Sequence, residues 1–143
     1  MQKKPAQSET LLKKAGLKKT DARVALLDLL ASASKPLSAK ALSAKLAKKA
    51  VDRVTVYRML EALSEKGIVR HVEIGSREAH YELTDTRADH HHVICLECKK
   101  IADFTGCDAD HLIAKALKQV KDFKSVSHHS FDLFGVCTSC AGK

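Results

Sequence analysis

Residues 54–73 read VTVYRMLEALSEKGIVRHVE, and this stretch decides the fold of the first half of the chain. Its apolar side chains recur at the i, i+3, i+4 and i+7 spacing of an amphipathic helix, predicted over Arg53–Lys66 and ended by Gly67. Two β-like runs follow, Ile68–Ile74 and Ala79–Leu83, with a turn at residues 75–77. A helix followed at once by a hairpin predicts the reading helix and wing of a winged helix-turn-helix.

Three further helices are predicted upstream of this stretch. The first is short and covers Glu9–Ala15, the second covers Asp21–Ala33, and the third follows a break at Lys35-Pro36. Side chains that can accept hydrogen bonds from the first helical amides precede the last three helices of this half: Thr20, Ser38 and Asp52.

The polar residues 85–89 are interpreted as a hinge between a winged-helix DNA-binding domain, residues 1–84, and a small α/β dimerisation domain, residues 90–143. The second domain is predicted to contain strands over Val93–Cys95 and Ile101–Phe104, a helix over Asp108–Val120, and one or two strands within Ser125–Val136. The helix is expected to turn five residues inward: Leu112, Ile113, Ala116, Leu117 and Val120. So small a domain buries little surface, and we expect metal or dimerisation to complete it. The predicted fold class is α+β.

The formal net charge of +8 is unevenly distributed along the chain. Residues 1–70 hold 16 of the 25 Lys and Arg but 6 of the 17 Asp and Glu, a net charge of +10, which leaves −2 for residues 71–143. All eight His lie at or after position 71, and all five Cys at or after position 95. The first half is therefore expected to meet a polyanion and the second half to hold cations. A basic half that merely aids solubility is the alternative.

The chain is expected to be cytoplasmic and to have no membrane association. No apolar run is long enough to cross a membrane, and the N-terminal residues MQKKPAQSET lack the apolar segment of a secretory signal. In a reducing compartment, five cysteines favour metal or redox chemistry over a disulfide framework.

The face of the reading helix opposite its apolar stripe carries Val54 and Arg58, flanked by Thr55 and Tyr57. In the major groove of double-stranded DNA, arginine can bond guanine edges, valine can touch a thymine methyl group, and hydroxyl groups can bond phosphates. Basic residues of the earlier helices would add phosphate contacts. The predicted DNA-binding residues are Lys14, Arg23, Val54, Thr55, Tyr57, Arg58 and Arg70. The alternative is an ordinary solvated helix face.

Two C-x-x-C pairs stand in the second half, Cys95 with Cys98 and Cys137 with Cys140. Two such knuckles can complete a tetrahedral shell of four thiolates around one zinc ion, and four protein ligands indicate a structural role. A thioredoxin-like redox pair is the alternative, but a reactive pair requires a helix N-terminus, whereas Cys95 follows a strand-like run. The fifth cysteine, Cys107, is interpreted as a packing residue.

A histidine tract, His90–His92, comes directly before the first cysteine pair. On a strand, alternate residues point to opposite faces, so His90 and His92 would face one way, toward Asp103, and His91 with Asp89 the other. Further candidates for the second face are Asp110, His111, His128 and His129, while His71 and His80 lie on the predicted wing. A site that shares ligands between wing and second domain would act as a switch. A surface tract with no ligand role is the alternative.

These motifs together resemble the ferric uptake regulator family across nearly the whole chain. The similar segments are LKKAGLKKTDAR (12–23), VTVYRMLEALSEKGIVRHVE (54–73), HHVICLEC (91–98) and HHSFDLFGVC (128–137). The resemblance implies a homodimer that, when loaded with metal, represses metal-uptake or stress genes at AT-rich palindromes. It implies zinc at the four cysteines and a sensing site with His90, His92 and Asp103. It also implies a second site, made of Asp89, His91, Asp110 and His129.

The sequence departs from the family at one position. Iron- and peroxide-sensing members usually place a sensing histidine just before the third helix, where this chain has Pro36. The wing instead offers His71, His80 and Glu82, and the position that resembles His80 is often a cysteine ligand in zinc sensors. Three histidines and a carboxylate favour zinc as the regulatory metal. The alternatives are iron(II) or manganese(II) at the same site, since both accept such ligands.

Two other classes of function compete with a metal-dependent repressor. A DNA-binding protein with structural zinc alone would bind its operator equally well after the labile metal was removed. A metal-dependent hydrolase would require an open coordination position and a general base in a substrate pocket. No catalytic motif is present, so the chain is expected not to be an enzyme and to have no small-molecule substrate.

Overall fold

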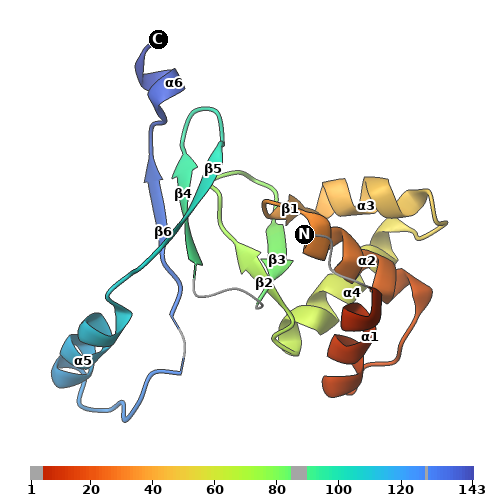
Figure 1. Ribbon diagram of the computed structural model, residues 1–143, viewed down its shortest axis with the longest axis horizontal. Helices are drawn as coiled ribbons and strands as arrows, with labels where there is room; N and C mark the ends of the chain where they lie inside the picture. Colours follow the sequence, from red (N-terminus) through yellow and green to blue (C-terminus); the bar gives the residue numbers. More distant parts are fainter. Residues whose placement is uncertain (1–4, 85–89, 128) are drawn as a thin grey trace. The chain divides into compact units, whose positions relative to one another are not determined.

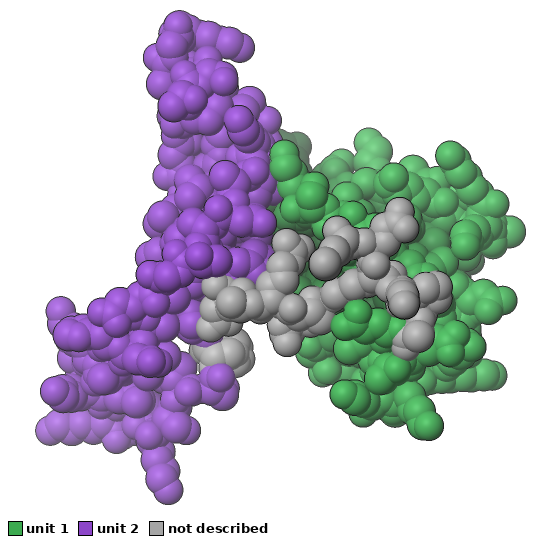
Figure 2. Space-filling model, viewed as in Figure 1, with its two compact units in different colours: residues 1–86 green, residues 87–143 purple. Residues whose placement is uncertain are grey.

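The computed structural model describes residues 5–84, 90–127 and 129–143. The chain divides into two compact units, unit 1 (residues 1–86) and unit 2 (residues 87–143), which are coloured separately in Figure 2. The hinge expected at residues 85–89 lies outside the described residues. Among the described helices, none is both long enough and apolar enough to span a membrane.

Unit 1 is a winged helix, as predicted, and has a leucine-rich core of its own. In chain order it contains α1 (Pro5–Lys14), α2 (Asp21–Ser32), β1 (Leu37–Ser38), α3 (Ala39–Ala47), α4 (Arg53–Glu65), β2 (Val69–Val72) and β3 (His80–Leu83) (Figure 1). Each of the four helices contributes core side chains that are at most 1% exposed: Leu12, Leu26, Leu27, Leu42, Leu46, Val56, Leu60 and Leu63. Burial of each such side chain stabilises the fold by about 2 kcal/mol.

The three predicted helix caps of unit 1 are confirmed. In each, a side-chain oxygen accepts a hydrogen bond from a backbone amide three residues further on, at distances of 2.9–3.2 Å. The amide of Arg23 donates to Thr20, that of Ala41 to Ser38, and that of Thr55 to Asp52. These bonds satisfy amides that have no partner within the helix, and they set where α2, α3 and α4 begin.

The sheet of unit 1 has the strand order β1-β3-β2, and its pairs are antiparallel. Strand β1 was not predicted, because it has two residues and exists only through pairing with β3, where Leu37 lies opposite Tyr81. The β2–β3 hairpin is the predicted wing. Its register places Arg70 opposite Glu82 and His71 opposite Tyr81.

Unit 2 is built on a second sheet. It contains β4 (His90–Cys95), β5 (Ile101–Thr105), α5 (Ala109–Gln119), β6 (Asp132–Gly135) and α6 (Thr138–Ala141). Strand β4 is central, antiparallel to β5 and parallel to β6. Within this unit, α5 and α6 lie beyond opposite ends of the sheet (Figure 1).

Unit 2 differs from the prediction in two respects. The segment Ser125–Val136 contains one strand, β6, as expected, but the short helix α6 was not predicted. The prediction that α5 turns an apolar face inward is wrong for the single chain, because no residue of α5 is buried. An amphipathic sequence predicts that one face of a helix packs against other apolar residues. It does not say whether those residues belong to the same chain.

Candidate metal centres and nucleic-acid interface

The four cysteines of the two C-x-x-C pairs converge at one end of the unit 2 sheet. Cys95 ends β4, which lies parallel to β6 with Cys95 opposite Gly135, and the second pair begins two residues later at Cys137. All four sulfur atoms lie within 4.8 Å of one another. The Sγ atoms of Cys98 and Cys137 are 3.7 Å apart, close to the ~3.8 Å between thiolates that share a tetrahedral zinc ion.

Backbone turns hold each cysteine pair. After Cys95, the amide of Lys99 returns to the Cys95 carbonyl at 3.0 Å, while Lys99 itself adopts a positive φ of 63°. Cys137 is the N-cap of α6, and the amide of Cys140 donates to its carbonyl at 3.0 Å. Both turns point two thiols at a common centre, which is the arrangement of a zinc knuckle.

The electrostatics of this thiol group favour a cation. The amide of Cys137 donates to Sγ of Cys95 at 3.4 Å, and this bond, together with weaker hydrogen bonds from Cys98 and Glu97, lowers the pKa of Cys95 to about 6. The neighbouring thiols of Cys137 and Cys98 raise the pKa of Cys140 well above its usual value. The four thiols cannot all lose their protons unless a cation balances the charge, and a zinc ion would supply that charge. The residues therefore fit a structural zinc ion.

His92 lies in the central strand of the unit 2 sheet, between two carboxylates. The register of β4 sets it opposite Asp103 of β5 and opposite Asp132 of β6. Its Nδ1 atom lies 3.2 Å from Oδ1 of Asp132, and its Nε2 atom 3.8 Å from Oδ1 of Asp103. Only 2% of His92 is exposed, and its ring centroid is 5.2 Å from that of His90.

Asp132 was missed by sequence reasoning, although Asp103 was predicted. A carboxylate bonded to one ring nitrogen of a histidine orients the ring and raises the basicity of the other nitrogen toward a metal. The only signal for Asp132 was its place in the segment HHSFDLFGVC. Its position beside His92 depends on the parallel pairing of β4 with β6, which joins residues forty positions apart.

The predicted ligands of the wing occupy two faces of the unit 1 sheet. His71 lies opposite Tyr81, with 5.7 Å between their ring centroids, whereas Glu82 is the next residue along β3. Since neighbouring residues of a strand point to opposite faces, His71 and Glu82 lie on different faces. His80 shares the face of Glu82, and its Nδ1 atom lies 2.9 Å from the Glu78 carbonyl oxygen. The structure therefore does not bring His71 together with the other two wing residues.

Glu82 and Arg70 form an ion pair on this wing. The Nε–H of Arg70 donates to Oε1 of Glu82 at 2.6 Å, and a terminal nitrogen of the same guanidinium contacts that oxygen as well. A residue predicted to contact DNA is thus paired with a residue predicted to bind metal.

The residues predicted for the second metal site are brought together only in part. The rings of His91 and His129 lie 5.2 Å apart. Asp110 is in the first turn of α5 and does not belong to the group of ligand atoms around these rings, while Asp89 lies outside the described residues. The third member of that group is Cys107, which was interpreted as a packing residue.

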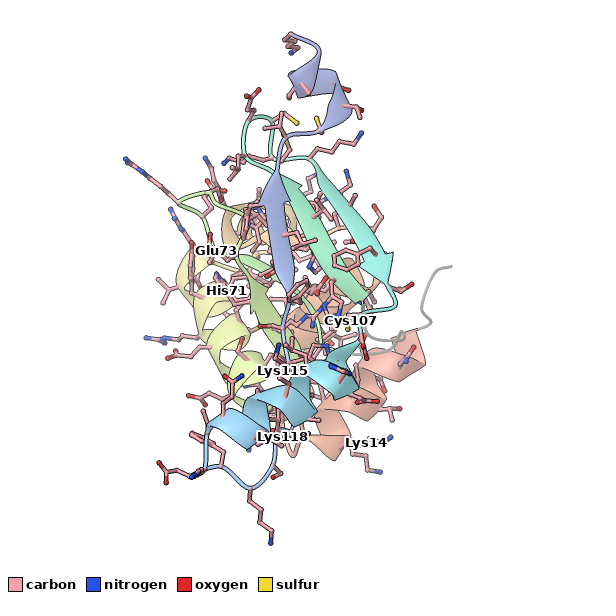
Figure 3. The ribbon with its side chains drawn as sticks, turned by 90° about the vertical axis from the view of Figure 1, so that its left-hand side faces the viewer. Lys14, His71, Glu73, Cys107, Lys115 and Lys118 are labelled. Atoms are coloured by element: carbon pink, nitrogen blue, oxygen red, sulfur yellow. The ribbon has the colours of Figure 1, made fainter. Side chains whose placement is uncertain are left out.

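Helix α4 presents the candidate nucleic-acid interface. Its predicted buried stripe is confirmed, and Val54, Tyr57 and Arg58 lie on the exposed side, with Val54 59% exposed. A groove of about 780 Å³ runs between this side of α4 and the wing residues His71 and Tyr81. Figure 3 shows His71 on the wing and Lys14 at the end of α1.

Other predicted DNA contacts have partners within the protein. The Thr55 hydroxyl donates to Oδ2 of Asp52 at 2.7 Å. This hydrogen bond and the hydrogen bond from the Thr55 amide hold the pKa of Asp52 below its usual value. Arg23 donates to the Lys18 carbonyl at 2.7 Å. Arg53 was missed, although it lies on the exposed side of α4, where its guanidinium stacks 5.6 Å from the Tyr57 ring. Its i, i+4 spacing from that tyrosine was the available signal.

A winged helix joined to clusters of thiol and imidazole ligands defines a metal-binding transcriptional regulator. The ferric uptake regulator family matches residues 14–133, and the chain belongs to this family. Members of the family are metal-responsive, dimeric DNA-binding regulators, so the chain is a transcriptional regulator and not an enzyme. The resemblance seen in the motifs is thereby confirmed.

The relatives of this chain include both peroxide and ferric uptake regulators. The peroxide operon regulator of Bacillus subtilis (strain 168) is 33% identical over 136 residues, which cover 92% of this chain and 90% of that protein. The ferric uptake regulation protein of Neisseria meningitidis (strain DSM 15465 / Z2491) is 31% identical over 136 residues, 92% of each protein. A solved structure of the ferric uptake regulator from Pseudomonas aeruginosa with manganese aligns with a TM-score of 0.71 and 27% identity, covering 92% of this chain and 98% of that one.

Proposed function

We propose that this chain is a cytoplasmic, zinc-responsive repressor that binds operator DNA as a homodimer when its regulatory metal site is filled. The observation that carries the proposal is His92, a buried histidine held between Asp103 and Asp132, in a chain whose other unit is a winged helix that exposes Arg58 on α4. The proposed operators are AT-rich palindromes that control metal-uptake genes.

The proposed regulatory ligands come from both sides of the hinge at residues 85–89. Unit 2 would supply His90, His92 and Asp103, and the wing would supply Glu82 and His80, which share one face of their sheet. A metal held by both units would set the orientation of the winged helix and thus the spacing of the two reading helices in a dimer. By linkage, DNA must then tighten metal binding as much as metal tightens DNA binding.

The ion pair on the wing suggests how the signal would pass to DNA. A metal bound by Glu82 would compete with Arg70 for the same carboxylate oxygen. An arginine released in this way would be able to bond a phosphate. Metal binding and DNA binding would then be coupled through one side chain, in addition to the orientation of the units.

A homodimer would cover the apolar surface of unit 2. Leu112 of α5 is 58% exposed, Val120 at its end 45%, and Leu133 and Phe134 of β6 42% and 44%. Several large apolar side chains left in water on a small unit are typical of an interaction surface. A second copy of this chain is the proposed partner, because regulators of this family are dimeric.

Two features support zinc as the regulatory metal. Pro36, which has no ligand atom in its side chain, stands where iron and peroxide sensors of the family usually have a histidine. The remaining imidazole and carboxylate ligands match tetrahedral zinc. Iron(II) or manganese(II) is the second candidate, because these ions accept the same ligands and the relatives include ferric and peroxide regulators.

The test is operator binding by fluorescence anisotropy, at fixed salt and buffered free metal, with protein that keeps its structural zinc and has an empty regulatory site. Zinc is expected to tighten binding about 5- to 150-fold, at lower free concentrations than iron(II) or manganese(II) require. The variant Arg58→Ala should bind zinc normally yet lose affinity for the operator, which separates metal binding from DNA reading. Tightening mainly by iron(II) or manganese(II) would reassign the metal, and indifference to every metal would reject the repressor mechanism.

Asp132→Asn is expected to weaken binding of the regulatory metal about 10- to 100-fold, because asparagine lacks the negative charge that holds the His92 ring. Competition with a metal-binding dye measures this affinity, on protein that retains its structural zinc. Asp122→Asn is the matched control, since Asp122 is exposed in the segment after α5 and belongs to no ligand group of the described residues. Equal affinities in the two variants would show that Asp132 does not act on the metal.

A further inference from the structure

Two histidine side chains from separate parts of unit 2, His91 and His129, meet at the sulfur of Cys107. The Nε2 atom of His91 lies 2.9 Å from Sγ of Cys107, and the Nε2 atom of His129 lies 3.4 Å from the same sulfur. His91 belongs to β4, Cys107 to the connection between β5 and α5, and His129 to the segment before β6. Figure 3 shows Cys107 at the junction of β5 and α5.

The backbone positions Cys107 for this contact. Gly106 comes directly before it and has a φ of 84°, in the left-handed region that glycine adopts without strain. The chain therefore turns sharply where β5 ends and α5 has not begun. The side chain of Asp108, the N-cap of α5, makes no capping hydrogen bond.

The surroundings of the group are largely apolar. His91 is 4% exposed, and its ring lies 5.4 Å from the Phe104 ring and 5.8 Å from the Phe131 ring, measured between centroids. A cavity of about 260 Å³ adjoins the group and is lined by both phenylalanines together with Cys107 and His129. The aromatic rings limit the orientations open to His91, and the cavity leaves room for a further ligand such as water.

We propose that His91, Cys107 and His129 form a second metal centre with a thiolate ligand, selective for zinc or another thiophilic cation over iron(II) and manganese(II). Two imidazoles, one thiolate and an open position match a zinc site that keeps a free coordination position. A bound cation would remove the thiol proton, and soft sulfur ligands disfavour the harder ions. In tetrahedral coordination, nitrogen and sulfur ligands lie about 3.6 Å apart, so His129 already has the right spacing and His91 would withdraw by roughly 0.6 Å.

This centre differs from the carboxylate-containing second site that the family resemblance implies. Cys107 takes the place that Asp110 was expected to fill, since Asp110 does not join the group around the two imidazoles. The centre is separate from the proposed regulatory site, and its test does not depend on operator binding.

The test is cobalt(II) substitution in the full chain, with the four-cysteine site filled by zinc and the regulatory site disabled by His90→Ala and His92→Ala. One equivalent of cobalt(II) should produce a near-ultraviolet charge-transfer band from thiolate to cobalt. Adding Cys107→Ser to this background should abolish the band and lower zinc affinity about 100-fold, with little change in the affinity for manganese(II). Retention of one zinc ion per chain and an unchanged circular dichroism spectrum show that the variant is folded.

Asp110→Asn in the same background is the matched control and should keep the band. If the band survives Cys107→Ser, or never forms, the thiolate centre is refuted. If Asp110→Asn weakens zinc binding and Cys107→Ser does not, the carboxylate set holds the metal and the proposal is overturned.

Discussion

If the four-thiol group holds a structural zinc ion, Cys95→Ser is expected to lose this ion and, with it, the folded state of unit 2. Cys95 is buried at the end of β4 and accepts a hydrogen bond from the Cys137 amide, so its sulfur joins the two knuckles. Binding of a structural zinc contributes about 10–16 kcal/mol in small zinc domains. The free energy of unfolding of a small domain is only about 5 kcal/mol, so a loss of that size would unfold it. Zinc content per chain and the mass in solution measure the effect, and the variant should be a zinc-free monomer.

Unit 1 should survive this change. Its leucine core is drawn from α1–α4 and the wing, and it includes no residue of unit 2. Limited proteolysis of Cys95→Ser is therefore expected to digest unit 2 and leave a resistant fragment that contains the winged helix. This outcome would show that the zinc maintains one unit and not the whole chain.

Cys107→Ser is the matched control for this experiment, because it makes the same chemical change at a cysteine outside the four-thiol group. It should keep one tightly bound zinc ion and remain dimeric. A Cys95→Ser protein that stayed folded and dimeric without zinc would contradict the structural role of the four thiols.

The second large effect is expected from the double variant His90→Ala, His92→Ala. If both imidazoles bind the regulatory metal, their removal leaves only two carboxylates and the wing histidine, a much weaker set of ligands for zinc than the complete site. The metal-induced gain in operator affinity, about 5- to 150-fold in coupled systems of this kind, should disappear. The affinity of the metal-free protein for the operator should stay within about 2-fold of the parent, since mutations at distant sites act independently.

Fluorescence anisotropy with buffered zinc measures both quantities. His111→Ala is a suitable control, because His111 is exposed on α5 and belongs to no ligand group of the described residues. It should respond to zinc as the parent does. Metal-dependent operator binding that persists in the double variant would place the regulatory site elsewhere, and the structural zinc content would show whether the variant had simply unfolded.

Much of the fold could be predicted because it rests on local patterns. The apolar spacing of α4 depends on residues within two helical turns, and the caps at Thr20, Ser38 and Asp52 depend on amides three residues away. Two features that escaped prediction depend on contacts outside their own segment. Strand β1 exists only beside β3, and no residue on the apolar face of α5 is fully buried by the part of the chain that the structure describes.

The sequence by itself determined the ligand types, their spacing within each motif and the separation of basic residues from cysteines and histidines. The tertiary structure alone decided several contacts between ligands that lie far apart in the sequence. It set Asp132 beside His92, placed Cys107 between His91 and His129, and put His71 on the face opposite Glu82. The physical reason is that the spacing within a motif is set by bonds along the chain, whereas contacts between distant side chains depend on strand order and register. A shift of one residue in register would reverse the face of every side chain on a strand.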